Sequence, residues 1–189
     1  PPEEREAIRA ELGLNRPILE QYVDFLGQIV TLDFGNSLVH GRRPIRDELA
    51  EVFPATVELT VPAMVFTAIF GIASGAYAAA HRKQASDYAL RIFSVVIYSI
   101  PIFWLGLILQ LIFGVALNWL PISHRIDPQI DLTLVRNTNL LVLDSITSGN
   151  LEALGSVLRH LILPVLTLGL ALTGVFVRLT RVNMIETLK

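Results

Sequence analysis

Three stretches of the chain contain no Asp, Glu, Lys or Arg, and their lengths suit a lipid bilayer. They cover residues 59–80, 92–117 and 161–177. A spanning helix needs about 20 apolar residues, within a range of about 17–25, because the hydrocarbon core is about 30 Å thick. The third stretch is at the lower edge of that range, and Arg178 can lengthen it by extending its guanidinium toward the interface. The pattern predicts an all-α membrane helix bundle with these three spans, whereas three buried helices of a soluble bundle are disfavoured.

The composition narrows the class further. Hydrophobic residues make up 52% of the 189 residues and charged residues only 17%, with a mean hydropathy of +0.55. The apolar excess argues against disorder, and a formal net charge of −2 argues against a basic nucleic-acid-binding protein. The absence of cysteine excludes disulfides, Cys-based metal sites and a Cys nucleophile.

The charges that flank the spans predict the topology. Basic residues outnumber acidic ones in segments 81–91 and 178–189, whereas acidic residues predominate in 1–58 and 118–160. By the positive-inside rule, the first two segments are expected in the cytoplasm and the last two outside a cell membrane that the chain crosses several times. Because residue 59 would then enter the membrane from outside, we expect a further spanning helix to precede this sequence.

The sequence divides into an outer segment, 1–56, and a partial transmembrane domain, 57–189. The outer segment is expected to hold a charged helix over 1–12 and an amphipathic helix opened by Pro17. The outer loop 118–160 is expected to be polar and irregular until Asn150, which can cap a short helix over 151–158 that leads into the third span.

Small and polar residues inside the spans are candidates for helix packing and for a solute pathway. Gly106, Gln110 and Gly114 share a face of the second span, and the Gln110 side chain can either bond to another helix or line a wet pathway. Pro101 removes a backbone donor, which predicts a kink in that span. The packing candidates are Ala68, Gly71, Gly75, Ala79, Gly106 and Gly114, and the pathway candidates are Ser99, Pro101 and Gln110.

Motifs for catalysis are missing from the sequence. There is no GxxxxGK[ST] phosphate loop and no GxSxG nucleophile elbow. The four histidines, His40, His81, His124 and His160, lack metal-binding spacing, so we expect no catalytic residue, metal or cofactor. His160, beside Arg159 at the start of the third span, is best interpreted as an interfacial residue. No carboxylate lies inside a span, which disfavours ion-coupled transport.

Several stretches together resemble one family of membrane proteins. They are ELGLNRPILEQYVDFLGQIVTLDFGNSL (11–38), PATVEL (54–59), SIPIFWLGLILQLIF (99–113), LPIS (120–123), LDSITSGN (143–150) and RHLILPVLTLGLALTGVFVRLTRVNMIETL (159–188). In this order they resemble the B-type permease subunit of the dipeptide, oligopeptide and nickel ABC importers. The resemblance covers most of the chain.

The resemblance implies a type I ABC importer permease that carries dipeptides or oligopeptides by alternating access. The implied partners are a C-type permease subunit, two cytoplasmic ATPase subunits, an extracytoplasmic solute-binding protein and the lipid bilayer, without nucleic acid. A spanning helix would precede this segment and two would follow. Arg178, Arg181 and Glu186 would approach the coupling loop that docks into the ATPase, and that loop would begin just beyond Lys189. Nickel or another small solute, and a non-transporting membrane assembly subunit, are the alternative functions.

Overall fold

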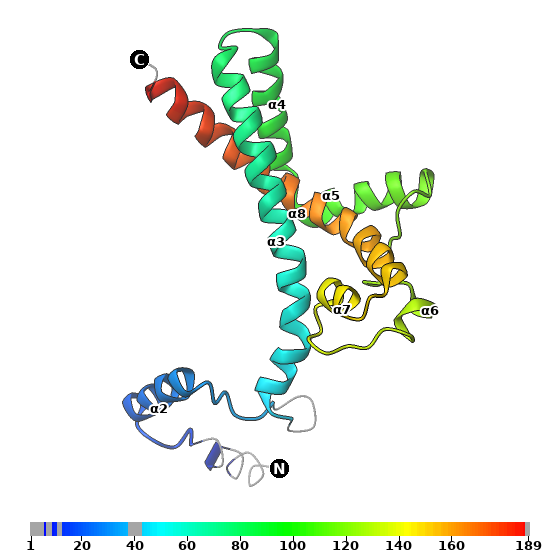
Figure 1. The fold of residues 1–189 in the computed structure, drawn as a ribbon. Coiled ribbons are helices and arrows are strands. Elements are labelled where there is room, and N and C mark those ends of the chain that lie inside the picture. The colour runs from blue at the N-terminus through cyan, green and yellow to red at the C-terminus, as the bar shows by residue number, and fades with distance from the viewer. Residues whose placement is uncertain (1–5, 7–8, 11–12, 38–42, 188–189) are drawn as a thin grey trace. The chain divides into compact units, whose positions relative to one another are not determined.

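The computed structural model describes residues 6, 9–10, 13–37 and 43–187, and in these ranges regular structure is helical apart from one isolated bridge between Asn36 and Pro44 (Figure 1). The predicted all-α class is confirmed. Contacts divide the chain into two units, Pro1–Phe53 and Pro54–Lys189. Each unit is described by itself below.

The first unit contains the amphipathic helix α2, Ile18–Thr31. Pro17 precedes it with a φ of −54°, which suits a helix start, and Leu32 ends it in the left-handed conformation with a φ of 57°. None of its residues is buried. The prediction of this helix is confirmed, whereas most of the helix expected over 1–12 lies outside the described residues.

Two helices in the described part of the chain are each long and apolar enough to cross a membrane. They are α3, Ile45–Ala80, and α8, Leu151–Thr187. The predicted spans 59–80 and 161–177 lie inside them. Asn150 caps α8 as expected, because its Oδ1 accepts a hydrogen bond from the Ala153 backbone N–H at 2.9 Å. The expected short helix 151–158 is not a separate element but the first turns of α8.

The second predicted span is not one continuous helix. It consists of α4, Ala85–Ser99, then α5, Ile102–Leu109, and the π-helix η1, Gln110–Ala116. The axis turns by 105° between α4 and α5. Pro101 cannot continue the hydrogen-bond ladder, and it forces Ile100 into an extended conformation with a ψ of 125°. The predicted kink at Pro101 is confirmed, whereas the helical segment begins at Ala85 and not at Ile92. The bent pair forms a third span if its two arms cross the membrane together.

Helix α8 is the common neighbour of the other elements in the second unit, where α4, α5, α6 and α7 all pack against it (Figure 1). Helix α3 also contacts it. The buried Thr67 hydroxyl of α3 lies 3.0 Å from the Gly169 carbonyl oxygen of α8. Small residues permit this close approach, which supplies packing energy that hydrophobicity cannot supply inside lipid.

The loop 118–160 forms a small folded cap, so the prediction of an irregular loop is wrong. It contains α6, Pro128–Asp131, and α7, Leu141–Thr147. Its core contains Ile126, Leu134 and Leu141, which are buried together with Ala153 and Val157 of α8. These apolar residues are too widely spaced in sequence to give a periodic signal, and the first turns of α8 complete their burial.

Candidate functional site

A cavity of about 440 Å³ lies where α5, η1, α8 and residues 121–124 meet. Most of its wall is apolar, including Leu59 of α3 and Leu163 of α8. The polar groups that line it are Gln110, Ser123, His124, His160 and Thr167. An apolar wall with a few polar groups is typical of small-molecule sites.

Gln110 stands at the point where the α-helical α5 changes to the π-helical η1. Its Nε2 donates a hydrogen bond to the Ile122 carbonyl oxygen at 3.3 Å, which ties the cavity wall to the chain that returns from η1. Gly114 lies directly under the Ile122 side chain, and a Cβ at this position would collide with it. π-Helical turns are rare and are frequently found at functional sites.

His160 lines the cavity from α8. Its Nδ1 lies 2.7 Å from the Ser156 carbonyl oxygen, which can only accept, so Nδ1 carries a proton and Nε2 is the nitrogen left for other partners. Pro164, four residues later, has no N–H for the His160 carbonyl, which leaves this oxygen without its usual helical donor. The site thus combines acceptors and donors in an otherwise apolar surrounding.

Of the three pathway candidates, Gln110 alone lines this cavity. Gln110 and Gly106 both line the cavity, and Ile102, directly after Pro101, lines it too. Ser99 is exposed at the end of α4, where its hydroxyl donates to the Val95 carbonyl at 2.8 Å. Ser99 is therefore not part of this cavity.

Three of the small residues singled out in the sequence, Gly71, Gly75 and Gly106, lie at contacts between helices. A Cβ on Gly71 would come within 2.5 Å of Phe176 Cβ, and a Cβ on Gly75 within 2.7 Å of Thr180 Cβ. Gly106 lies against Thr167. Ala79 is buried and Ala68 is half-buried.

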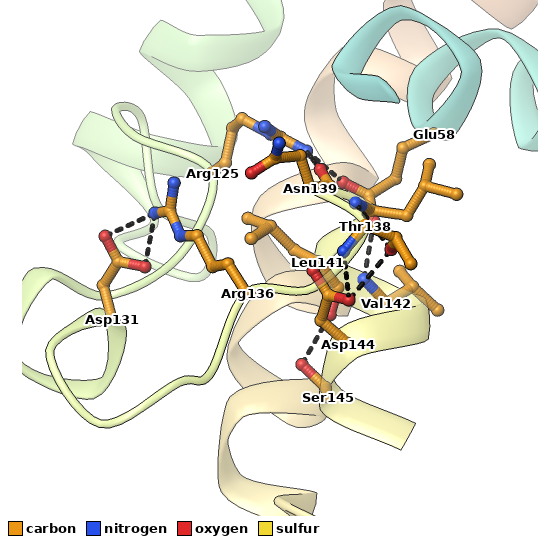
Figure 2. Close-up of polar contacts among 11 residues, drawn as sticks. Glu58, Arg125, Asp131, Arg136, Thr138, Asn139, Leu141, Val142, Asp144 and Ser145 are labelled. Carbon is orange, nitrogen blue, oxygen red and sulfur yellow. Dashed lines mark hydrogen bonds and ion pairs between the residues drawn. The ribbon is translucent and has the colours of Figure 1, made fainter. Parts of the chain in front are cut away.

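A polar network joins α3 to the cap and was not predicted (Figure 2). Glu58, 7% exposed, accepts a 2.6 Å hydrogen bond from the Arg125 guanidinium and another of 2.6 Å from the Val142 N–H. Arg125 also donates to the Asn139 carbonyl at 3.3 Å. The sequence does contain one indication of this network, because Glu58 lies directly before a charge-free run. A carboxylate at the edge of a span needs a partner.

Asp144 at the start of α7 is fully buried within the cap. Its Oδ1 accepts hydrogen bonds from the Thr138 hydroxyl at 2.8 Å and from the Thr138 backbone N–H at 3.0 Å (Figure 2). Burial by itself would raise the pKa of Asp144, but these donors outweigh it and hold the pKa below its ordinary value. The charged carboxylate therefore fixes the segment before α7.

A second buried ion pair joins α4 to α8. Arg181 donates from Nε to Asp87 Oδ1 at 2.5 Å and from Nη2 to Asp87 Oδ2 at 2.8 Å. Segment 81–91, which the sequence marks as a short basic segment, contains the start of α4 at Ala85 and the buried Asp87. Arg178, one turn before Arg181, is exposed, as is Glu186.

No group of three or more His, Asp or Glu side chains gathers to hold a metal within the ranges that the structure describes. Gln110, His124 and His160 can bind a polar solute through hydrogen bonds.

Comparison with known proteins connects this architecture with transport. Residues 71–189 match the family described as the binding-protein-dependent transport system inner membrane component. The chain is 38% identical over 178 residues to a di/tripeptide transport system permease protein of Pseudomonas aeruginosa, covering 94% of this chain and 52% of that protein. It is 36% identical over 183 residues to a probable D,D-dipeptide transport system permease protein of Escherichia coli, covering 97% and 53%.

A third relative, the putrescine export system permease protein of E. coli, is 37% identical over 168 residues, covering 87% of this chain and 51% of the relative. The chain thus spans about half the length of the curated relatives that it matches. The family match extends over more than half of the chain and contains α4, α5, η1, α8 and the cap between them. The chain therefore belongs to the family of binding-protein-dependent transport system inner membrane components.

Proposed function

We propose that this chain is part of the permease subunit of an ATP-driven importer of dipeptides or oligopeptides in the cytoplasmic membrane. The observation that carries the proposal is the similarity of nearly the whole chain to permease proteins named for di/tripeptide and dipeptide transport. The ATPase and the extracytoplasmic binding protein are separate partners, with a second permease subunit beside this one.

The cavity at Gln110 supports a peptide as the solute. Every peptide presents amide N–H donors and carbonyl acceptors, whatever its side chains are. Gln110 has an amide that can donate and accept, and His160 presents Nε2 as a further hydrogen-bonding atom. Apolar walls accept side chains of varied shape without a specific partner. This combination suits a carrier that tolerates different sequences.

Alternating access requires parts of the permease to move against one another. The 105° turn at Ile100–Pro101 separates α4 from α5, and α8 contacts both. We infer that ATP-driven movement enters through the end of α8 and changes the angle between these two arms, which opens and closes the cavity at Gln110. Such a change needs a difference in binding free energy between the states, which the ATPase supplies.

Uptake into proteoliposomes that contain the complete importer tests the proposal. We expect ATP-dependent accumulation of a radiolabelled dipeptide, which stops when the ATPase or the binding protein is omitted. Nickel and putrescine serve as competing solutes. Accumulation of either of these without peptide uptake, or export in place of import, would contradict the proposal.

The orientation is tested separately by cysteine labelling, because the chain contains no cysteine. Gln84 and Asn137 are exposed positions at the α3–α4 turn and in the cap. An impermeant thiol reagent should label Gln84→Cys only in inverted vesicles and Asn137→Cys only from the outside. The reverse pattern would refute the proposed topology.

A further inference from the structure

A second cavity, of about 290 Å³, lies between α4 and the C-terminal half of α8. It shares no lining residue with the cavity at Gln110. Arg91, Arg178 and Arg181 line it, and so does Tyr98. Gly174 allows α8 to approach α4 here, because a Cβ on it would lie 2.8 Å from the Ser94 carbonyl oxygen.

The charge in this cavity is positive and only partly compensated. Arg181 is neutralised by Asp87, whereas Arg91 and Arg178 form no ion pair with any residue that the structure describes. No carboxylate lines the cavity. Asp87 also attracts Arg91 without forming an ion pair with it, so Arg178 and, in part, Arg91 are left to face an anion.

Each of these guanidinium groups lies near an aromatic ring, and of the two rings Tyr98 lines the cavity. The Cζ atom of Arg178 lies 5.8 Å from the centre of the Tyr98 ring, and that of Arg91 lies 5.8 Å from the centre of the Tyr88 ring. A cation–π contact holds a guanidinium by its face and leaves its N–H groups available in the plane. Guanidinium groups presented in this way match the oxygens of a phosphate.

Apart from Ser94, the rest of the wall is apolar. Val95 of α4 and Val175 of α8 line the cavity one turn from the arginines, on the side that faces the membrane in the proposed topology. A free anion or an acidic protein segment would gain nothing from valine, whereas the acyl chain of a lipid would. Basic pockets between spanning helices on the cytoplasmic side are typical sites for anionic lipid headgroups.

We propose that this cavity binds an anionic phospholipid, with the phosphate between Arg91 and Arg178 and an acyl chain along Val95 and Val175. The proposal rests on the topology given under the proposed function, which places residues 81–91 and 178–189 at the cytoplasmic headgroup level. The lipid would join α4 to the end of α8 beside the Asp87–Arg181 ion pair.

Native mass spectrometry of the purified complete importer, without peptide or ATP, tests the site. The importer is delipidated and then mixed with equal amounts of phosphatidylglycerol and phosphatidylcholine. We expect preferential retention of phosphatidylglycerol, reduced by about tenfold or more in the Arg91→Gln/Arg178→Gln variant. The Arg82→Gln/Lys83→Gln variant removes the same charge from the neighbouring exposed turn and should retain the lipid as the parent does. Arg91→Lys/Arg178→Lys should retain most of it.

Several outcomes would overturn this proposal. One is that the parent retains both lipids equally. Another is that the two glutamine variants lose the lipid equally. A third is that millimolar inorganic phosphate displaces the lipid, which would indicate a site for a free anion. Efficient cross-linking of Val95→Cys to a partner subunit would show that a protein covers the cavity. Because lipid retention is measured without transport, a lipid-binding importer that moves no peptide would refute only the proposed function.

Discussion

Arg181, near the end of α8, holds Asp87, in the first turn of α4, through two hydrogen bonds across 94 residues of sequence. The Asp87 side chain is 2% exposed and that of Arg181 18%. Removing both charges from water is costly, so the intact pair adds little net stability. Removing only one partner is strongly destabilising, because the other charge is then buried without a counterion. It connects the chain after α3 to the segment that leads toward the proposed ATPase contact.

Asp87→Asn should therefore destabilise the protein strongly, because it leaves the Arg181 charge buried without its counterion. The expected loss is about 3 kcal/mol in the free energy of unfolding, measured by denaturation of the detergent-solubilised protein. The double variant Asp87→Leu/Arg181→Met removes both charges and should recover most of this loss. Arg82→Gln, at an exposed position, is the control. An Asp87→Asn variant as stable as the parent would refute the role of the pair.

The contact between α3 and α8 predicts a contrast between two glycines. Gly75→Ala would place a methyl group 2.8 Å from the Val177 carbonyl oxygen, whereas a Cβ at Gly155 meets nothing within 4 Å. Because an overpacked contact costs about 1–3 kcal/mol, Gly75→Ala should lower the thermal unfolding midpoint. Gly155→Ala should leave it unchanged or raise it slightly. Equal effects of the two substitutions would contradict the close approach of the helices.

Asp144 predicts how the stability of the cap depends on pH. Since the folded state lowers the pKa of Asp144 from 3.8, its contribution is fully present above that pH and is lost as the pH falls through the lower folded value. The thermal unfolding midpoint, followed by tryptophan fluorescence, should therefore fall more steeply below pH 4 in the parent than in Asp144→Asn. Parallel pH profiles would show that Asp144 does not stabilise the fold by its charge.

The sequence predicted the helical class, the family and the approximate positions of α3 and α8. Long runs without charged residues indicate helices that lie in the hydrocarbon core of a membrane. It also predicted the break at Pro101, since proline acts locally on the residues around it. The size of that break could not be predicted, because the packing of α5 against α8 decides whether a proline bends a helix slightly or turns it by 105°.

The ion pairs and the cap depend on contacts that no local pattern encodes. Glu58 and Arg125 are 67 residues apart and meet only when α3 and the cap have folded. Asp87 lies in a short basic segment of the sequence, and its burial depends on Arg181, which is 94 residues away. Gln110 was noticed as the most polar side chain within a span, but its bond to Ile122 requires the chain after η1 to fold back.

The central claim is that the cavity at Gln110 lies on the path of the peptide, and substrate protection tests it most directly. In the complete importer, Gln110→Cys would be the only cysteine of this chain, and its rate of modification by a small thiol reagent is measured with and without dipeptide-loaded binding protein. We predict that the peptide slows modification at this position and leaves the rate at Asn137→Cys, in the exposed cap, unchanged. Equal rates at Gln110→Cys with and without peptide, in an importer that still accumulates peptide, would contradict the claim.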